Sequence, residues 1–342
     1  MTERMKAVLI NTTFQLGHHG CTLVDRQLDD LATEAGIDVT EKLPLHSDWQ
    51  RLAPVDFDVI LVNGEGALHH DTKAARRLAE VPAWARERRK PAFLINSVYE
   101  ANGAEVAAGV ARYDGVFARD EFSREALVEA GIVAAVVPDL TLSWQPAPTR
   151  GKGHLVVVTD STVQDTNARL HKMSCTIGAR YLPLMARPPR PIVWAHADAS
   201  RWWRYAAKRL AAHVAPSGLW RDRWRGLIPE FDDYIDWMAK NAGLVVAGRF
   251  HGVCIALDLG IPVLGVASNT WKIEAVLAGA GLQHRLVSSL DELQHRLKAE
   301  GIEPFLYTAA EIERISDFRD KARASARAMF QSIGRTGGAR PQ

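Results

Sequence analysis

Several features that would place this protein in a specialised class are scarce in its sequence. The 342 residues include only three cysteines, Cys21, Cys175 and Cys254, which are widely spaced and form no CxxC pair. This usage argues against a disulfide framework or a structural zinc site, and it fits a reducing compartment. The formal net charge is only +2. The molecule as a whole therefore lacks the positive field that gathers nucleic acid.

Long apolar runs are also missing. No run approaches the roughly 20 residues that a helix needs to span a bilayer. The apolar residues 7–10 form too short a run for a signal peptide. We therefore predict a cytoplasmic protein. Tryptophans and arginines are interleaved in residues 201–225. One interpretation is functional: the tryptophans stack on sugar rings, or the segment makes peripheral contact with an inner membrane. The other is structural: the same pattern is produced by the half-buried faces of amphipathic helices.

The regular feature that is present is an alternation of short β-rich runs with helical stretches, which is the pattern of parallel sheets covered by helices on both faces. Helices are expected at residues 22–35 and 120–130. Strands are expected at residues 7–11, 59–63, 92–95, 116–118, 134–137, 155–159, 192–195, 244–247 and 263–266.

The length of the chain exceeds the usual limit for one domain. Residues 143–153, SWQPAPTRGKG, are rich in proline and glycine and mark the boundary. We predict two Rossmann-like domains, residues 1–145 on the acceptor side and residues 154–307 on the donor side. A C-terminal helix at residues 308–334 follows, and packing back on the N-terminal domain is one arrangement for it.

The most informative segment is GLVVAGRFHGVCIALDLG, residues 243–260, where a buried strand runs through Gly248 into Arg249 and His251 and then into an apolar helix. Ligands of parallel sheets bind beyond the carboxyl ends of strands. A helix N-terminus there adds free N–H groups and a positive dipole. We predict that Arg249 and His251 bind a phosphate or carboxylate in a cleft between the domains, with His251 passing a proton. The alternative is a helix-capping arginine beside a solvent-facing histidine.

A second segment, DVILVNGEGALHHD at residues 58–71, leads from a buried strand into a turn. Glycines at such a turn let the backbone approach a ligand, so Asn63, Gly64 and Gly66 are candidate substrate-binding residues. Glu65 lies between two glycines and is a candidate general base toward a sugar hydroxyl. The alternative for Glu65 is a loop carboxylate that bonds to neighbouring N–H groups.

The loops after the first strand of each domain are expected to face the same cleft. His18 and Asp160 lie in these loops and are candidate substrate ligands. Adjacent histidines such as His69 and His70 lack a carboxylate at ligand spacing, so no metal site is predicted.

Three charged residues after later strands are interpreted as structural. Asp120 can cap the helix that follows it. Arg119 can form a salt bridge with Asp139.

Taken together, these segments resemble the polysaccharide pyruvyl transferase family. The similar pieces are the glycine-rich turn at residues 63–68, VFARDEFSREALVEAGI with the following VVPDLTL, and GRFHGVCIALDLGIPVLGVASNTWKIEAVLAGAGL at residues 248–282. The resemblance implies a fold like that of two-domain B-type glycosyltransferases. It also implies transfer of a pyruvyl group from phosphoenolpyruvate to a sugar of a bacterial-type surface glycan, giving a ketal, with no further cofactor.

The resemblance also implies roles for single residues. Arg249 and His251 match the family's Arg-x-His motif. The resemblance implies that both bind phosphoenolpyruvate and that the histidine is the general acid that protonates its enol carbon. Lys272 matches a position that is usually lysine, and Asn269 in the same stretch is assigned to substrate binding. The chain departs from the family at Glu65 in the glycine turn, and at residues 18–21, HHGC, where many members have Gly-Asp. An arginine expected near the strand that ends in TDS, residues 159–161, is also not evident.

Two further readings stay open. A glycosyltransferase of the same build would use a nucleotide-activated sugar donor, for which an acidic sugar is one option, with Glu65 or Asp160 as its catalytic carboxylate. A glycan-binding protein on the same frame would lack activity. The expected partners are phosphoenolpyruvate or an activated sugar, a glycan or lipid-linked sugar acceptor, and no nucleic acid.

Overall fold

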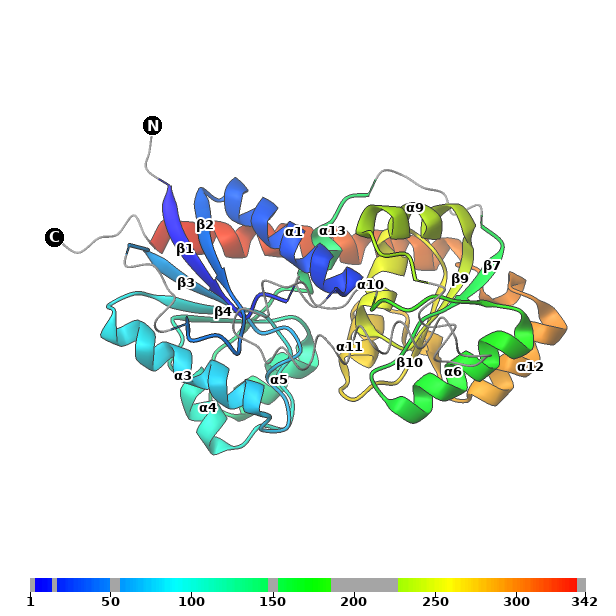
Figure 1. The fold of residues 1–342 in the computed structure, drawn as a ribbon, viewed down its shortest axis with the longest axis horizontal. Coiled ribbons are helices and arrows are strands. Elements are labelled where there is room, and N and C mark those ends of the chain that lie inside the picture. The colour runs from blue at the N-terminus through cyan, green and yellow to red at the C-terminus, as the bar shows by residue number, and fades with distance from the viewer. Residues whose placement is uncertain (1–3, 14–16, 50–55, 147–152, 186–226, 337–342) are drawn as a thin grey trace, which may run out of the picture. The chain divides into compact units, whose positions relative to one another are not determined.

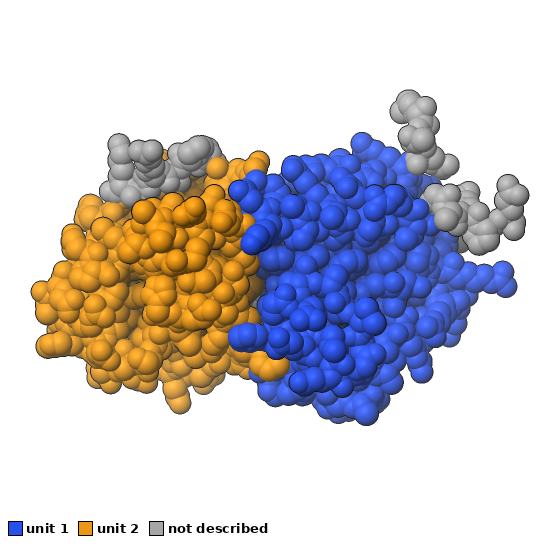
Figure 2. All heavy atoms as spheres, turned by 180° about the vertical axis from the view of Figure 1, so that it is seen from behind, with its two compact units in different colours: residues 1–13, 24–143, 320–342 blue, residues 14–23, 144–319 orange. Residues whose placement is uncertain are grey.

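The computed structural model describes residues 4–13, 17–49, 56–146, 153–185 and 227–336. The chain divides into two compact units, shown in Figure 2. Unit 1 comprises Met1–Thr13, Val24–Ser143 and Asp320–Gln342, and unit 2 comprises Phe14–Leu23 and Trp144–Arg319. Two segments therefore belong to a different unit from their neighbours in sequence. Phe14–Leu23, with the first turn of the first helix, is part of unit 2, and Asp320–Gln342, with the second half of the last helix, is part of unit 1.

Unit 1 is built on a six-stranded parallel sheet with the order β2-β1-β3-β4-β5-β6. Figure 1 labels its strands β1 to β4. The strands are β1 (Met5–Ile10), β2 (Ile37–Leu43), β3 (Val59–Asn63), β4 (Ala92–Ser97), β5 (Gly115–Ala118) and β6 (Ala135–Val136). The helices are α1 (His19–Glu34), α3 (Lys73–Glu87), α4 (Ala104–Val110), α5 (Glu121–Glu129), the 3-10 turn η2 (Leu140–Ser143) and α13 (Ala309–Thr336), with α1 and α13 shared with unit 2.

Both faces of this sheet are buried, as expected for parallel strands between helices. Along β1, Val8 and Ile10 pack into one core cluster with α3 and α4. Ala7 and Leu9 point the other way, into a cluster with α1 and with Phe330 of α13. The alternation in β1 thus fixes two hydrophobic layers, one on each face.

Unit 2 has a five-stranded parallel sheet with the order β11-β10-β9-β7-β8. Its strands are β7 (Leu155–Val158), β8 (Arg180–Tyr181), β9 (Ala242–Ala247), β10 (Val263–Val266) and β11 (Leu286–Val287). Its helices are α6 (Gln164–Ile177), α9 (Phe231–Asn241), α10 (Phe250–Asp258), α11 (Lys272–Gly279) and α12 (Leu290–Glu300), with the 3-10 turns η4 (Gln283–Arg285) and η5 (Glu303–Phe305).

The predicted α/β class with two parallel, Rossmann-like sheets is confirmed. The predicted structural roles of three charged residues are also confirmed: Asp120 accepts a hydrogen bond from the backbone of Ser123 as N-cap of α5, and Arg119 pairs with Asp139 in the interior. The strand predicted at residues 192–195 lies outside the described residues. None of the helices in the described part of the chain combines the length and apolar character needed to cross a bilayer.

Two features of unit 1 and its first helix differ from what the sequence predicts. Strand β2 was not predicted, because IDVTEKL is an edge strand whose middle residues are polar and largely exposed. Helix α1 begins at His19 and not at residue 22. Its first turn is capped by the ring of His18, and histidine is not among the residues that usually mark a helix start.

Candidate active site

The centre of the candidate site in unit 2 is the junction between β9 and α10. Every residue of β9 and of α10 is buried, so this strand and helix form the interior of the unit. Gly248 joins them without a side chain: a Cβ there would lie 2.6 Å from Leu170 Cδ1 and 2.9 Å from the carbonyl oxygen of Asp160. Arg249 is the N-cap residue of α10, and His251 is in its first turn. Both side chains therefore stand beside the positive end of the helix dipole.

Arg249 is held by a buried carboxylate. Its Nε lies 2.7 Å from Oδ2 of Asp160, which has no exposed surface, while the arginine side chain keeps 14% of its own exposed. The other oxygen of Asp160 accepts a hydrogen bond of 3.0 Å from the N–H of Leu184. The ion pair uses Nε, so the two terminal nitrogens of Arg249 keep the forked geometry that suits a carboxylate or phosphate. Asp160 thus orients Arg249 from the interior.

His18 lies in the same site although 233 positions separate it from His251 in the chain. The two rings meet edge to face with centroids 5.5 Å apart. The approach depends on Gly20, because a Cβ there would meet the Cβ, Cγ and Nδ1 atoms of His251 well inside van der Waals contact. A backbone bridge between His18 and Met185 holds the loop in unit 2.

The neighbours of His18 make the site electropositive. Burial lowers the pKa of His18 well below its ordinary value of 6.5, and the charges of Arg249, His251, His19 and Lys272 lower it further. A histidine in this environment is neutral at neutral pH. Arg249 and Lys272 are therefore charged neighbours of an uncharged His18.

Lys272 and Asn269 lie together after β10. Lys272 Nζ donates to Asn269 Oδ1 at 3.2 Å, and the same oxygen accepts from the hydroxyls of Thr162 and Ser268, each at 3.2 Å. These groups are exposed. They form a hydroxyl-rich and cationic surface at the carboxyl ends of β7 and β10 in unit 2.

The second histidine of the HHGC segment has a structural role. His19 stacks on Tyr234 of α9 with ring centroids 4.2 Å apart. Its Nε2 lies 2.9 Å from the carbonyl oxygen of Ile228, which can only accept, so this nitrogen donates. His19 thus fixes the segment before α9.

Three side chains of the site, His18, Cys21 and His251, are of types that bind metal ions, and their ligand atoms lie within 4.8 Å of one another. The tautomer of His18 does not suit a metal, because its Nδ1 already accepts N–H groups of Gly20 and Cys21 at 3.1 and 3.4 Å. An ion on Nδ1 would uncap α1. An ion on Nε2 would require a proton on Nδ1, facing two N–H donors. These residues do not fit a metal centre.

Unit 1 contains its own polar cluster at the carboxyl ends of β1, β3 and β4. Glu65 accepts a hydrogen bond of 2.6 Å from the hydroxyl of Thr13 and one of 3.4 Å from the amide of Asn63. Asn63 in turn accepts from the amide of Asn96. Asn96 has the left-handed φ of 53°, which costs energy in a residue with a side chain. The network holds a half-buried carboxylate in a defined place beside amide and hydroxyl groups.

The glycines of this turn serve the fold. Gly64 packs against the side chain of Ser97 so closely that a Cβ would clash with it. Gly66 has a left-handed φ of 65° with open space around it. The approach of a ligand to these two glycines stays a prediction, and the structure gives each of them a reason in the backbone. Thr13, which fixes Glu65, was not predicted, since only its loop position pointed to it.

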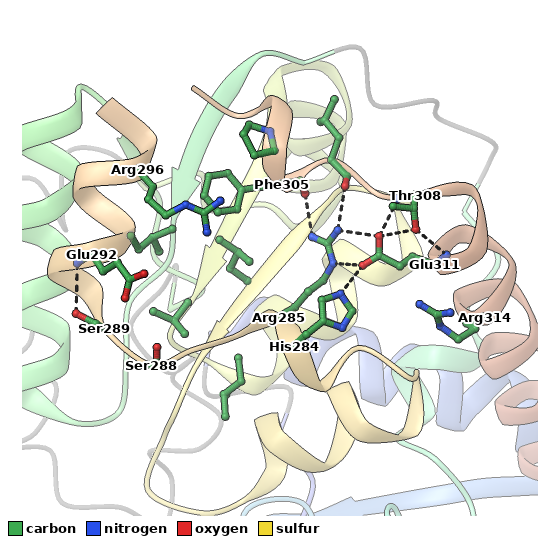
Figure 3. A pocket seen from close by; sticks show the side chains of 16 residues that line it. His284, Arg285, Ser288, Ser289, Glu292, Arg296, Phe305, Thr308, Glu311 and Arg314 are labelled. Atoms are coloured by element: carbon green, nitrogen blue, oxygen red, sulfur yellow. Dashed lines mark hydrogen bonds and ion pairs between the residues drawn. The ribbon is translucent and has the colours of Figure 1, made fainter. Parts of the chain in front are cut away.

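A separate pocket of about 480 Å³ lies in unit 2 between β11, α12 and the start of α13 (Figure 3). Glu311 receives Arg285 Nε at 2.6 Å, His284 at 2.8 Å and the N–H of Thr308 at 2.7 Å. Burial alone would raise the pKa of Glu311, but the hydrogen bonds from Arg285, Thr308 and His284 outweigh it and hold the pKa far below 4.5. Among the described residues that line this pocket, none is a predicted site residue. Its central ion pair joins the sheet edge to α13.

Comparison with known proteins gives a family and a fold. A family model described as polysaccharide pyruvyl transferase matches residues 12–270. No curated protein sequence matches the chain. The chain resembles a UGT protein of Glycyrrhiza uralensis solved with glycyrrhetinic acid 3-O-monoglucuronide, at a TM-score of 0.52 and 10% identity over 98% of this chain and 96% of that one.

A second similar structure is UGT2 of Phytolacca americana, solved with UDP-2-fluoro-glucose and pterostilbene. It has a TM-score of 0.50 and 10% identity, and the match covers 98% of this chain and 100% of that one. The structural neighbours are B-type glycosyltransferases, so the predicted fold class is confirmed. At this identity the likeness concerns the fold alone.

Proposed function

The chain belongs to the polysaccharide pyruvyl transferase family and is a transferase, and we propose that its donor is phosphoenolpyruvate and its product a pyruvate ketal on a surface-glycan sugar. The observation that carries the donor assignment is the cationic group of unit 2. Arg249, oriented by Asp160, stands with His251 at the N-terminus of α10, and Lys272 adds a second positive charge. Such a group suits a small, multiply charged anion.

In the proposed reaction, the terminal nitrogens of Arg249 hold the carboxylate or phosphate of the donor. His251 gives a proton to the methylene carbon of the enol, which becomes a methyl group and leaves a cationic centre at the adjacent carbon. One acceptor hydroxyl adds to that carbon and loses its proton, the bond from that carbon to the phosphate oxygen breaks, and a second hydroxyl adds in its place and also loses its proton. One of these two protons replaces the proton that His251 gave, and the other leaves on the phosphate. Inorganic phosphate leaves, and two new carbon–oxygen bonds form the ketal.

For the acceptor, we propose a glycan or lipid-linked sugar whose hydroxyl is deprotonated by Glu65. The support is the network in unit 1, where Thr13 and Asn63 hold this carboxylate among hydroxyl and amide groups. General-base catalysis requires a carboxylate held in a fixed place within hydrogen-bond reach of the hydroxyl. Residues 201–225, whose tryptophans suggested sugar or membrane contact, lie outside the described residues.

The test is binding of phosphoenolpyruvate to the purified full chain by calorimetry and thermal shift. We expect native protein to bind it, Arg249→Ala and His251→Ala to lose binding, and the exposed control Arg169→Ala to keep it, because Arg169 forms only a surface pair with Asp291. Glu65→Gln should bind the donor normally. No heat and no shift with phosphoenolpyruvate would refute the donor assignment.

A second candidate is a glycosyltransferase with a nucleotide-activated sugar. The observation in its favour is the fold, which is shared with a protein solved with UDP-2-fluoro-glucose. In this case the catalytic carboxylate would be Glu65, because Asp160 is fully buried and committed to Arg249 and Leu184. Stabilisation by UDP, with none by phosphoenolpyruvate in the same screen, would select this candidate.

A further inference from the structure

His18 forms an uncommon helix cap. Its Nδ1 accepts the N–H groups of Gly20 at 3.1 Å and Cys21 at 3.4 Å, and its carbonyl accepts the N–H of Thr22 at 3.0 Å. The bonds to Nδ1 are those that the oxygen of a serine or aspartate cap makes to the second and third helical residues. The ring therefore supplies an acceptor to N–H groups that would otherwise lack one.

This cap fixes the tautomer of the imidazole. A ring nitrogen that accepts hydrogen bonds carries no proton, and in neutral histidine the proton is then on the other nitrogen. The structure thus gives His18 an Nε2–H group. Adding a proton to Nδ1 would point it at two N–H donors and at the positive end of α1. The surrounding charges of Arg249, His251, His19 and Lys272 oppose that proton as well.

The backbone beside His18 is linked to Arg249 through hydrogen bonds. The N–H of His19 donates to the carbonyl of Leu184 at 3.1 Å, and the N–H of Leu184 donates to Asp160, the partner of Arg249. The cap residue and the arginine are therefore positioned by one short chain of contacts inside unit 2. On its other side, the ring of His18 faces the ring of His251.

We infer that His18 is a permanently neutral hydrogen-bond donor, whose Nε2–H binds an oxygen of the anion held by Arg249, and that α1 enforces this role. The cap occupies Nδ1 of this buried ring and leaves Nε2–H for a contact outside α1. The inference rests on the proposed function for the identity of the anion, phosphoenolpyruvate. It divides the labour between two neighbouring histidines: His18 donates without titrating, and proton transfer falls to His251.

The tautomer is tested without any ligand. In the full chain labelled with nitrogen-15 in its histidines, two-bond nitrogen–proton correlations distinguish the two neutral tautomers, and the signals that vanish in His18→Asn identify the residue. We expect the Nε2–H pattern, unchanged across the range where ordinary histidines titrate. An Nδ1–H pattern, or titration near the ordinary midpoint of 6.5, would overturn the inference.

The binding role is tested with His18→Asn, because asparagine is a good helix cap and preserves the fold while removing Nε2–H. Calorimetry with phosphoenolpyruvate should show roughly 10- to 100-fold weaker binding, because one hydrogen bond to a charged group is lost. The melting temperature should stay unchanged. The matched control is His295→Asn on the exposed face of α12, with native affinity. Native affinity in His18→Asn would show that the cap is only structural and overturn the role. If the native protein does not bind phosphoenolpyruvate, the donor assignment is refuted instead. The tautomer spectrum then still tests whether the cap fixes the proton of His18 on Nε2.

Discussion

The contact between Gly20 and His251 allows a sharp test of how the site is held together. Alanine at position 20 would place its Cβ 2.5 Å from Nδ1 of His251 and still nearer to the Cβ and Cγ atoms, where ordinary contact begins at 3.4 Å. Cβ and Cγ are close to the backbone of α10 and cannot swing away as the tip of a long side chain can. Either α1 or His251 must then move by about 1 Å, a displacement large enough to damage a catalytic site.

The expected magnitude follows from two opposing effects. Overpacking a close contact costs about 1–3 kcal/mol, while replacing a helical glycine by alanine returns up to about 1 kcal/mol. Gly20→Ala should therefore lower the free energy of unfolding by up to about 2 kcal/mol in a denaturant titration. If the shift takes His251 away from the donor, one hydrogen bond to a charged group is lost, and phosphoenolpyruvate binds roughly 10- to 100-fold more weakly.

A matched control lies on the neighbouring helix. Gly252 follows His251 directly, and an alanine Cβ there would find its nearest atoms at 3.3 Å, in Ala247 and Leu184. A shift of a few tenths of an ångström relieves that contact, so Gly252→Ala should change stability by no more than about 0.5 kcal/mol and leave donor binding native. Native stability and native donor affinity in Gly20→Ala would refute the argument that this glycine positions the histidine.

Two further predictions concern the ion pairs of unit 2. Asp160→Ala leaves Arg249 partly buried without its partner and should lower the free energy of unfolding by about 3 kcal/mol in a urea titration. The control Asp291→Ala, on the surface, should change it by less than about 0.5 kcal/mol. Equal effects of the two variants would contradict a structural role for Asp160. The folded-state pKa of Glu311 is depressed, so its contribution to stability is present above the ordinary value of 4.5 and is lost as the pH falls below it. Melting temperatures from pH 7 to 3 should therefore fall less steeply in Glu311→Gln than in the native protein, and parallel curves would be the contrary result.

The part of the site that could be predicted from sequence is the part that one continuous segment encodes. A buried strand followed by a glycine and an apolar helix fixes where Arg249 and His251 lie, because the strand–turn–helix geometry is local. The same holds for Glu65 after β3. These residues stand where the sequence pattern put them, at the carboxyl ends of parallel strands.

The part that could not be predicted depends on contacts between distant segments. Nothing local in the LGHHGC loop shows that its first turn belongs to unit 2 or that His18 meets His251. Asp160 was predicted to bind substrate, and its complete burial against Arg249 is a property of packing across the sheet. Strand β11 has only two residues, Leu286 and Val287, which is too few for a periodicity to be read.

The departure at residues 18–21 bears on the charge of the site. Where the resemblance implies an acidic loop in many family members, this chain has a neutral imidazole that still supplies an acceptor to the start of α1. A carboxylate there would cap the helix equally well and would also offset the charges of Arg249 and Lys272. The imidazole keeps the cap and adds no negative charge beside Arg249 and Lys272. Because Asp160 already neutralises one side of Arg249, the substitution makes the rest of the group more favourable for a multiply charged anion, which is the class of donor that we propose.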